Sequence, residues 1–323
     1  MSNLELRPAE VVCDSSGRAA SIAVEVLTPR VVPLGGTRAM RVSRTLPQRG
    51  RSLIGPWCFI DHYGPERVAM GVPAHPHTGL QTISWLFAGQ IEHRDSAGHH
   101  ALIRPGELNL MTAGRGISHA EVSTSDTTVL HGAQLWVALP SAERFADPAF
   151  EQYVPDVVRG AGFEARVFLG TLLGSTSPAA AQSPLVGAEI AIEPGHTAFI
   201  PVDAAFEHGV LVDTGTVTVD GTDVTRGSLG HVATGRDVIE LRAGDAGTAR
   251  VLMVGGRPLG ERILMWWNFV ARTHDEIVRY RADWQAEIGA GSRGQGRFGL
   301  PTGAAEPPLP APVMPNVRLK ARE

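Results

Sequence analysis

Cysteine is nearly missing from this chain of 323 residues, since only Cys13 and Cys58 occur and they do not form a Cys-x-x-Cys pair. Two cysteines cannot build a disulfide framework at this size, so a reducing compartment is expected. No apolar run approaches the roughly 20 residues of a membrane helix, and residues 1–12 lack the apolar core of a signal peptide. The sequence therefore predicts a cytoplasmic protein without a membrane partner.

A strong excess of charge is also missing, because the formal net charge is -4 and charged residues make up 19% of the chain. No global positive field would draw such a protein to nucleic acid, so no direct nucleic-acid partner is expected. Long apolar stretches with a 3.6-residue period are scarce, whereas glycine (37) and proline (23) are abundant. This composition is typical of short strands and turns, and the length suits two domains.

A weak internal repeat supports two related β-domains. Gly106-Glu107-Leu108 is followed by Gly114-Arg115, and Gly227-Ser228-Leu229 is followed by Gly235-Arg236 at the same offset. Such self-similarity suggests a duplicated β-barrel, although glycine-rich turns also recur by chance. Asp220-Gly221, flanked by short β-type runs, predicts a two-residue hairpin.

Helical signals are confined to two places. Residues 142–145 could form a short helix. Thr273-x-x-Glu276 has the spacing of a capping box, and the apolar residues after it fall at helical spacing before Gly289, which predicts the end of the helix. Those apolar residues are Ile277, Tyr280, Trp284 and Ile288. The Gly- and Pro-rich residues 289–323 predict an extended arm or a disordered tail.

The residues that carry chemistry are His75-Pro76-His77 and His119-Ala120-Glu121. Strand side chains two apart point to the same face, so each pair projects to one side of its strand. On neighbouring strands, the four donors would converge inside one barrel. Three imidazoles and a carboxylate suit Fe, Mn, Ni, Cu or Zn and leave coordination positions open for substrate, as in catalytic sites.

Other histidines compete for this role. His99-His100 fails the same-face rule and lies beside Gly98, which favours a turn. His93 lies among charged residues and is predicted to be solvated. His131 could lie inside the barrel beside a ligand or could be a buried structural residue. The second β-region offers His196, His208 and His231 without a His-x-His pair, so these are expected to be loop or core residues.

Residues 71–121 resemble the pirin family of cupins, through the motifs HPHTGLQT and PGELNLMTAGRGISHAE. The lead-in RSLIGPWCFIDHYGP and the segment AQLWVAL extend the resemblance over most of residues 25–290. The resemblance implies an all-β fold of two stacked cupin (jelly-roll-type) barrels with a few short helices. Its four metal ligands fall on His75, His77, His119 and Glu121, with one metal ion per chain in the first barrel only. The expected ion is Fe(II), with Ni, Mn, Cu, Zn or Co as alternatives.

On this basis we expect a mobile N-terminus at residues 1–22, a metal-binding cupin barrel at 23–150 and a C-terminal cupin barrel without metal at 151–288, which ends in a helix. The tail at 289–323 completes the chain. A monomer is expected, because the second barrel can cover the first.

The resemblance implies a quercetin 2,3-dioxygenase-type reaction on a small aromatic substrate with O₂. A flavonol loses the proton of its 3-hydroxyl, O₂ adds, the heterocyclic ring opens and carbon monoxide leaves. Pirins are also described as cofactors that bind other proteins, so an iron-dependent redox-sensing regulatory protein is an alternative. Another metal-dependent cupin activity, such as an isomerase, also stays open, because one fold hosts many chemistries.

For such a reaction, Glu121 is the candidate catalytic base, or else a plain metal ligand. Trp57, Phe59, Met111 and Trp136 are candidate walls of an aromatic pocket, or else ordinary core residues. Gln81 stands where many pirins carry Glu. The resemblance therefore implies that a carboxylate near the metal is replaced by an amide, which could change metal preference or redox potential.

Overall fold

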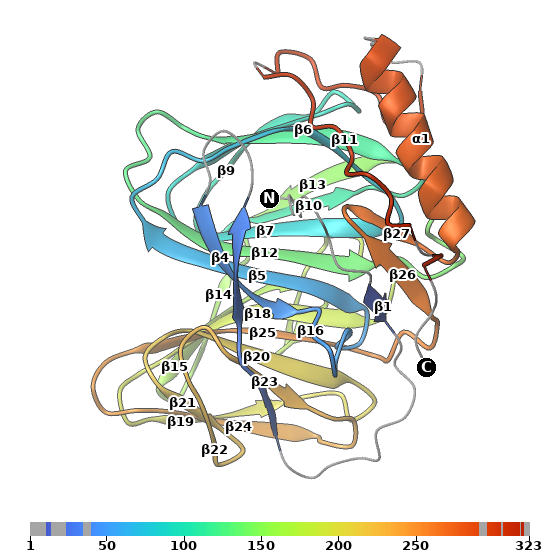
Figure 1. Cartoon of the computed structure of the whole chain (residues 1–323). Helices are drawn as coiled ribbons and strands as arrows, with labels where there is room; N and C mark the ends of the chain where they lie inside the picture. Colours follow the sequence, from blue (N-terminus) through green and yellow to red (C-terminus); the bar gives the residue numbers. More distant parts are fainter. Residues whose placement is uncertain are drawn as a thin grey trace.

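The structure is a computed structural model, and it describes residues 11–13, 24–34, 40–290, 296–304, 306–316 and 318–319. Most of the predicted mobile N-terminus, residues 1–10 and 14–23, lies outside the described residues. Within the described residues, no helix is long and apolar enough to cross a bilayer. Strands dominate the chain, and two jelly rolls lie one above the other (Figure 1).

The first jelly roll is made of two facing antiparallel sheets. The larger sheet contains, in spatial order, β13 (Ala149–Tyr153), β10 (Leu108–Thr112), β7 (Leu80–Ala88), β12 (Leu130–Ala138), β5 (Trp57–Glu66), β4 (Met40–Leu46) and β3 (Arg30–Leu34). The smaller sheet contains β6 (Gly71–His77), β11 (Ile117–Ser123), β8 (Ile91–Asp95) and β9 (His100–Ile103). Side chains from both sheets fill the space between them.

The second jelly roll repeats this plan. The larger sheet contains β14 (Val157–Gly160), β15 (Phe163–Leu169), β18 (Leu185–Ile192), β25 (Ala249–Gly256), β20 (Glu207–Thr214), β23 (Leu229–Val232) and β2 (Glu25–Leu27). The smaller sheet contains β19 (Thr197–Pro201), β24 (Val238–Ala243), β21 (Val217–Val219) and β22 (Thr222–Val224). The Asp220-Gly221 hairpin is confirmed, with positive φ at both residues, as a type I′ turn requires.

Two small sheets complete the strands. One contains β1 (Val11–Cys13), β26 (Ile263–Trp266) and β27 (Phe269–Ala271), and the other contains β16 (Thr171–Leu172) and β17 (Ser175–Thr176). β1 lies within the predicted mobile N-terminus, but it is a strand that pairs with β26.

The two jelly rolls have corresponding strand orders, so the fold is a duplication of the predicted kind. β10 corresponds to β23, β7 to β20 and β12 to β25 in the larger sheets, and β6 and β11 correspond to β19 and β24 in the smaller ones. The glycine repeat fits this correspondence, because Gly106 precedes β10 and Gly227 precedes β23, both with positive φ. Each unit is a pair of sheets rather than a closed barrel.

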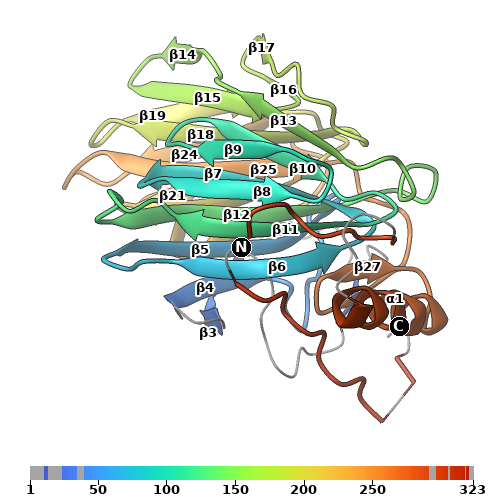
Figure 2. The ribbon, with the colours of Figure 1, turned by 90° about the horizontal axis from the view of Figure 1, so that it is seen from above.

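The larger sheets pack against each other and bury the outer face of each. One apolar cluster joins Trp57, Ile83 and Trp85 of the first sheet to Phe168 and Leu252 of the second. The indole Nε1 of Trp57 donates to the carbonyl of Gly255 at 2.9 Å. Figure 2 looks along the stacking direction from above, so the strands of the second unit lie behind those of the first.

A polar cluster also crosses the interface between the two units. The carboxylate of Asp213, on β20, accepts hydrogen bonds on Oδ1 from Nε2 of His62 at 2.7 Å and of His131 at 2.5 Å. Its Oδ2 accepts from Nε of Arg250 at 2.6 Å. Asp213 is completely buried. His131 is thus a buried structural residue that faces the second unit, which settles the alternative left open by the sequence.

Two strands lie across the predicted domain divisions. β2, inside the range 23–150, pairs with β23 of the second unit. β13 contains residue 150 and pairs with β10 of the first unit. The second unit therefore receives β2 from the predicted first domain, and β13 crosses the predicted division after residue 150.

The described chain contains one helix, α1 (His274–Ala290), and the predicted short helix at residues 142–145 is a run of turns. The capping box is confirmed, since Thr273 Oγ1 accepts from the N–H of Glu276 at 3.2 Å and Glu276 Oε2 accepts from the N–H of Thr273 at 3.3 Å. Ile277, Tyr280 and Trp284 are buried. The helix packs beside the first unit in Figures 1 and 2.

The described part of the C-terminal tail is an extended arm that lies between α1 and the smaller sheet of the first unit. Trp284 Nε1 of α1 donates to the Leu309 carbonyl at 2.8 Å, and the Leu309 N–H donates to the Ala74 carbonyl of β6 at 2.8 Å. Ser118 of β11 donates to the Gly299 carbonyl at 2.7 Å. The arm therefore covers the strands that carry the histidine motifs.

Candidate metal centre

The two histidine motifs lie on neighbouring strands of the smaller sheet of the first unit. β6 is the edge strand of that sheet, which tolerates Pro73 and Pro76 because an edge strand leaves some of its N–H groups unpaired. β11 pairs with β6 in antiparallel register, and His119 lies directly opposite His75. The register shifts between His119 and Glu121, because the step from His75 to Val72 contains one residue more than the step along β11, so the bulge lies on β6.

Three imidazoles converge inside the first unit. His75, His77 and His119 offer ligand atoms that all lie within 4.8 Å of one another, and all three are fully buried. Nε2 of His77 is 3.1 Å from Nε2 of His119. Two metal–nitrogen bonds of about 2.1 Å at a right angle place their nitrogens about 3 Å apart, so this spacing fits two ligands of one ion.

The protonation of these rings also suits a metal ion. Nδ1 of His75 bonds the Pro73 carbonyl at 2.8 Å, so it carries the proton, and the buried Nε2 is left with a lone pair and without a hydrogen-bond partner. Burial lowers the pKa of His75 to about 4. Burial likewise lowers the pKa of His77 and His119 well below 6.5. Neutral imidazoles are the form that binds a divalent cation.

Glu121 belongs to a second group, which shares His119 with the first. His93, His119 and Glu121 also offer ligand atoms within 4.8 Å of one another, and all are buried. Oε1 of Glu121 accepts a hydrogen bond of 3.4 Å from the Ser84 hydroxyl of β7. His119 therefore lies between two imidazoles on one side and a carboxylate with a third imidazole on the other.

The prediction that His93 is solvated is wrong, because His93 is only 2% exposed and points into the site. β8 alternates between buried and partly exposed residues, so His93 and Asp95 point inward, whereas Glu92 and Arg94 point outward and pair with each other. The His93-x-Asp95 spacing follows the same-face rule that identified the other pairs. That spacing was the signal that could have found this pair.

Three of the four predicted wall residues pack together beside the imidazoles. Phe59 and Trp136 stack with ring centroids 4.0 Å apart, and Met111 belongs to the same apolar cluster. The ring of His77 lies edge-on to that of Trp136, with ring centroids 5.3 Å apart. The prediction for Trp57 is wrong: a register shift near Trp136 turns Trp57 toward the second unit, where it packs in the interface.

Gln81 also faces the second unit rather than the imidazoles. Its amide Nε2 donates to the Thr112 hydroxyl at 2.9 Å and to the Ala180 carbonyl at 3.0 Å. The expected loss of a carboxylate beside the metal therefore does not apply, because this side chain points away from the histidine group. A different side chain, Tyr63, lies near Glu121. Burial, and to a lesser extent the charge of Glu121, holds the pKa of Tyr63 well above 10.0.

The second unit has no matching group among its described residues. β19 and β24, which correspond to β6 and β11, read TAFIP and VIELRA and contain no histidine. His196 is exposed, His208 is buried in the second unit, and His231 contacts Glu25 and Glu207 at the interface. The histidine cluster is therefore confined to the first unit.

Two stacked jelly rolls with a buried histidine and carboxylate group in one of them define a bicupin. Within this class, residues 39–137 match the family model described as Pirin, and residues 187–288 match the Pirin C-terminal cupin domain. This chain belongs to the pirin family.

Two relatives resemble this chain over nearly its whole length. A Pseudomonas aeruginosa protein named "Putative quercetin 2,3-dioxygenase" is 41% identical over 98% of both chains. The crystal structure of a quercetin 2,3-dioxygenase from Acinetobacter baumannii is 38% identical, covers 93% of this chain and 98% of its own, and has a TM-score of 0.85. A bacterial pirin from Escherichia coli, solved in complex with nickel(II), covers 73% of this chain and 99% of its own with a TM-score of 0.59, and at 20% identity it shows the shared fold.

Proposed function

We propose that this protein holds one divalent transition-metal ion through His75, His77, His119 and Glu121. The observation that carries the proposal is the convergence of three buried, neutral imidazoles, one of which presents an unpartnered Nε2. Fe(II) is the first choice, and Ni, Mn, Cu, Zn or Co also suit nitrogen and carboxylate donors. Two of the side chains that would hold the ion come from β6 and two from β11.

We infer that the metal serves a dioxygenase that acts on a flavonol-type aromatic substrate with O₂. The relatives from Pseudomonas and Acinetobacter bear names of this activity, and they match nearly the whole chain. A bound divalent metal would supply the acidification of a substrate hydroxyl by stabilising its anion. The buried aromatic pair of Phe59 and Trp136 beside His77 makes this side of the site apolar, as an aromatic substrate requires.

The proton of that hydroxyl needs an acceptor, and Glu121 is the carboxylate of the candidate metal site. The Ser84 hydroxyl shares its one proton between Oε1 of Glu121 at 3.4 Å and Oε1 of Gln134 at 2.9 Å. A carboxylate beside the metal position can accept the proton of a bound hydroxyl. The nearby Tyr63 hydroxyl keeps its proton because its pKa is raised, so it cannot serve as the base near neutral pH.

Turnover of quercetin tests this function. The protein is loaded separately with Fe(II), Ni, Mn, Cu, Zn or Co and mixed with quercetin in air. Loss of the flavonol absorbance together with release of carbon monoxide is expected with at least one metal. Failure of every metal-loaded form, in protein shown by elemental analysis to hold the ion, would overturn the dioxygenase assignment.

The same preparations test the alternative of a redox-sensing regulator. If quercetin is not turned over, the Fe(II) and Fe(III) forms are compared for binding to the same protein partners. Binding that depends on the oxidation state would favour the regulator, since one unit of charge changes at the site. Binding that ignores the oxidation state would exclude the switch.

A further inference from the structure

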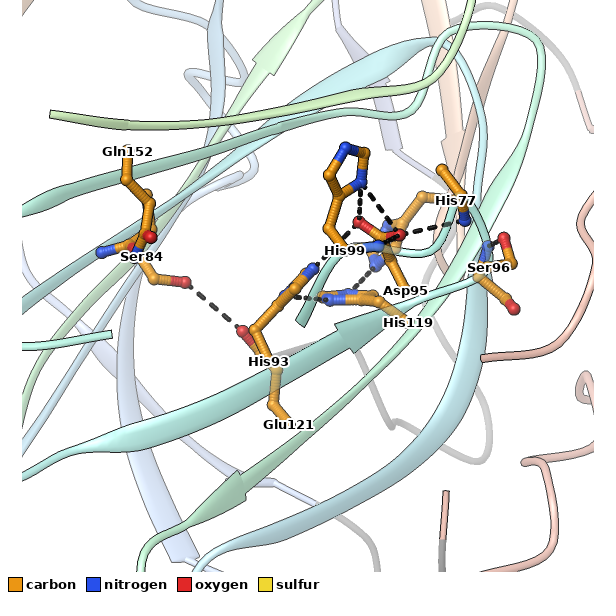
Figure 3. A network of polar contacts seen from close by, with 12 residues as sticks. His77, Ser84, His93, Asp95, Ser96, His99, His119, Glu121 and Gln152 are labelled. Atoms are coloured by element: carbon orange, nitrogen blue, oxygen red, sulfur yellow. Dashed lines mark hydrogen bonds and ion pairs between the residues drawn. The ribbon is translucent and has the colours of Figure 1, made fainter. Parts of the chain in front are cut away.

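Both ring nitrogens of His119 face other side chains, and these contacts form one chain that can be followed in Figure 3. On one side, Nε2 of His119 lies 3.1 Å from Nε2 of His77. On the other side, Nδ1 of His119 lies 3.3 Å from Nδ1 of His93, and Nε2 of His93 lies 3.2 Å from Oδ2 of Asp95. The chain therefore runs from a carboxylate through two imidazoles to the candidate metal position.

The carboxylate end of this chain can only accept hydrogen bonds. Oδ1 of Asp95 accepts from the backbone N–H groups of Ala97 at 2.9 Å and His99 at 3.0 Å, and the side chain is fully buried. An ionised carboxylate has no proton to give. Nε2 of His93 must therefore be the donor toward Oδ2, which leaves Nδ1 of His93 as an acceptor in the neutral ring.

The same donor and acceptor roles determine the tautomer of His119. Because Nδ1 of His93 accepts, Nδ1 of His119 carries the proton and donates, and Nε2 of His119 is left with its lone pair on the side of His77. This is the tautomer that can bind a metal through Nε2. The ring of His93 is itself held in place, since it stacks on Phe150 with centroids 4.5 Å apart and an angle of 22°.

We propose that Asp95 and His93 are positioning residues that fix His119 in its metal-binding tautomer and orientation. The inference rests on the proposed metal centre, and it assigns His93 a supporting role rather than that of a ligand. Both nitrogens of His93 are already engaged, one by Asp95 and one by His119, so neither is left for an ion. The sequence feature that provides this support is His93-x-Asp95 on β8, opposite Glu121 and His119 of β11.

The substitution Asp95→Asn reverses the donor and acceptor roles along these contacts and keeps the size and shape of the side chain. The amide oxygen would keep the bonds from the Ala97 and His99 N–H groups, so the amide NH₂ would face Nε2 of His93. His93 would then carry its proton on Nδ1 and oppose the N–H of His119. We expect metal affinity to fall about 10- to 100-fold, as for other partners of metal ligands, measured by competition of Fe(II) and of Zn(II) with a chelator.

A matched pair at His93 separates positioning from packing. His93→Asn places a side-chain oxygen near the position of Nδ1 and keeps an acceptor for His119, whereas His93→Phe keeps the ring and removes the acceptor. We expect His93→Asn to retain more metal affinity than His93→Phe, although phenylalanine preserves the stacking on Phe150 better. His100→Asn is the control: His100 lies on the same hairpin, is half-exposed and bonds Glu92, so unchanged affinity is expected.

Nitrogen-15 NMR of the zinc-loaded protein gives a readout that a purely structural role would not change. In the unsubstituted protein, we expect protons on Nδ1 of His119 and on Nε2 of His93. The Nδ1 proton of His119 should exchange faster with solvent in His93→Phe. Folding of each variant is checked by its thermal midpoint, and His93→Asn serves where another variant does not fold.

The outcomes for the two proposals are distinct. If the unsubstituted protein binds no metal ion, the metal centre and this inference both fail. If it binds metal, but Asp95→Asn and His93→Phe bind equally tightly with the same ring protonation, the positioning role is wrong and the metal centre stands. Coordination of the ion by a His93 nitrogen in the NMR spectrum would also overturn the inference.

Discussion

Replacement of His119 by alanine is expected to reduce metal affinity by at least about 100-fold, because loss of a mere partner of a ligand already costs 10- to 100-fold. His119 is the one side chain shared by both groups of candidate ligands, so its loss leaves neither complete. Elemental analysis of protein purified without added metal, followed by chelator competition, measures the effect.

His196→Ala is the matched control for this experiment. His196 lies in the second unit and is half-exposed, so its removal is expected to leave metal content unchanged. Equal metal content in His119→Ala and the unsubstituted protein, with both folded, would contradict the assignment of His119 as a ligand. A fall in both variants would indicate adventitious binding to surface histidines.

The second large effect is expected on stability, at the polar cluster between the two units. Asp213→Ala removes the carboxylate that accepts hydrogen bonds from His62, His131 and Arg250. Removing one partner of a buried ion pair typically costs about 3–5 kcal/mol, because the remaining groups stay buried without their partner. Arg250 is partly exposed, so the lower end, about 3 kcal/mol, is expected. Urea unfolding measures it.

Asp223→Ala is the control: Asp223 is the exposed residue of β22, so the free energy of unfolding is expected to change by less than about 0.5 kcal/mol. Similar losses in both variants would show that the Asp213 cluster adds nothing beyond an ordinary surface charge.

The Asp213 cluster also predicts that the free energy of unfolding depends on pH. Burial alone would raise the pKa of Asp213, but hydrogen bonds from His131 and His62 hold it well below 3.8. Its contribution is therefore present above about pH 4 and is lost as the pH falls toward the folded-state pKa.

The sequence was sufficient where one strand, read alone, determines which side chains share a face. His75 and His77 are two apart on β6, and the structure brings them together with His119 on the neighbouring strand. The capping box of α1 and the Asp220-Gly221 turn are equally local, and both were predicted. Such features depend on backbone geometry within a few residues.

The predictions failed where a bulge or the opposite sheet decides the outcome. Trp57 and Phe59 are two apart and would share a face in a regular strand, but the register shift beside Trp136 turns them to opposite faces. Gln81 lies on the face of β7 that is buried by the second unit, which no local pattern reveals. His93 was missed for another reason: its charged neighbours suggested solvent, although the alternation along β8 was readable from the sequence.

The central claim is tested most directly by anomalous X-ray scattering from crystals of protein purified without added metal and then soaked in Fe(II). A single strong peak is predicted among His75, His77 and His119, within bonding distance of Glu121. The direct hydrogen bonds among His62, His131 and Asp213 leave no room for an ion there. The account is contradicted if the soaked ion binds at that cluster, or if no peak lies among His75, His77 and His119.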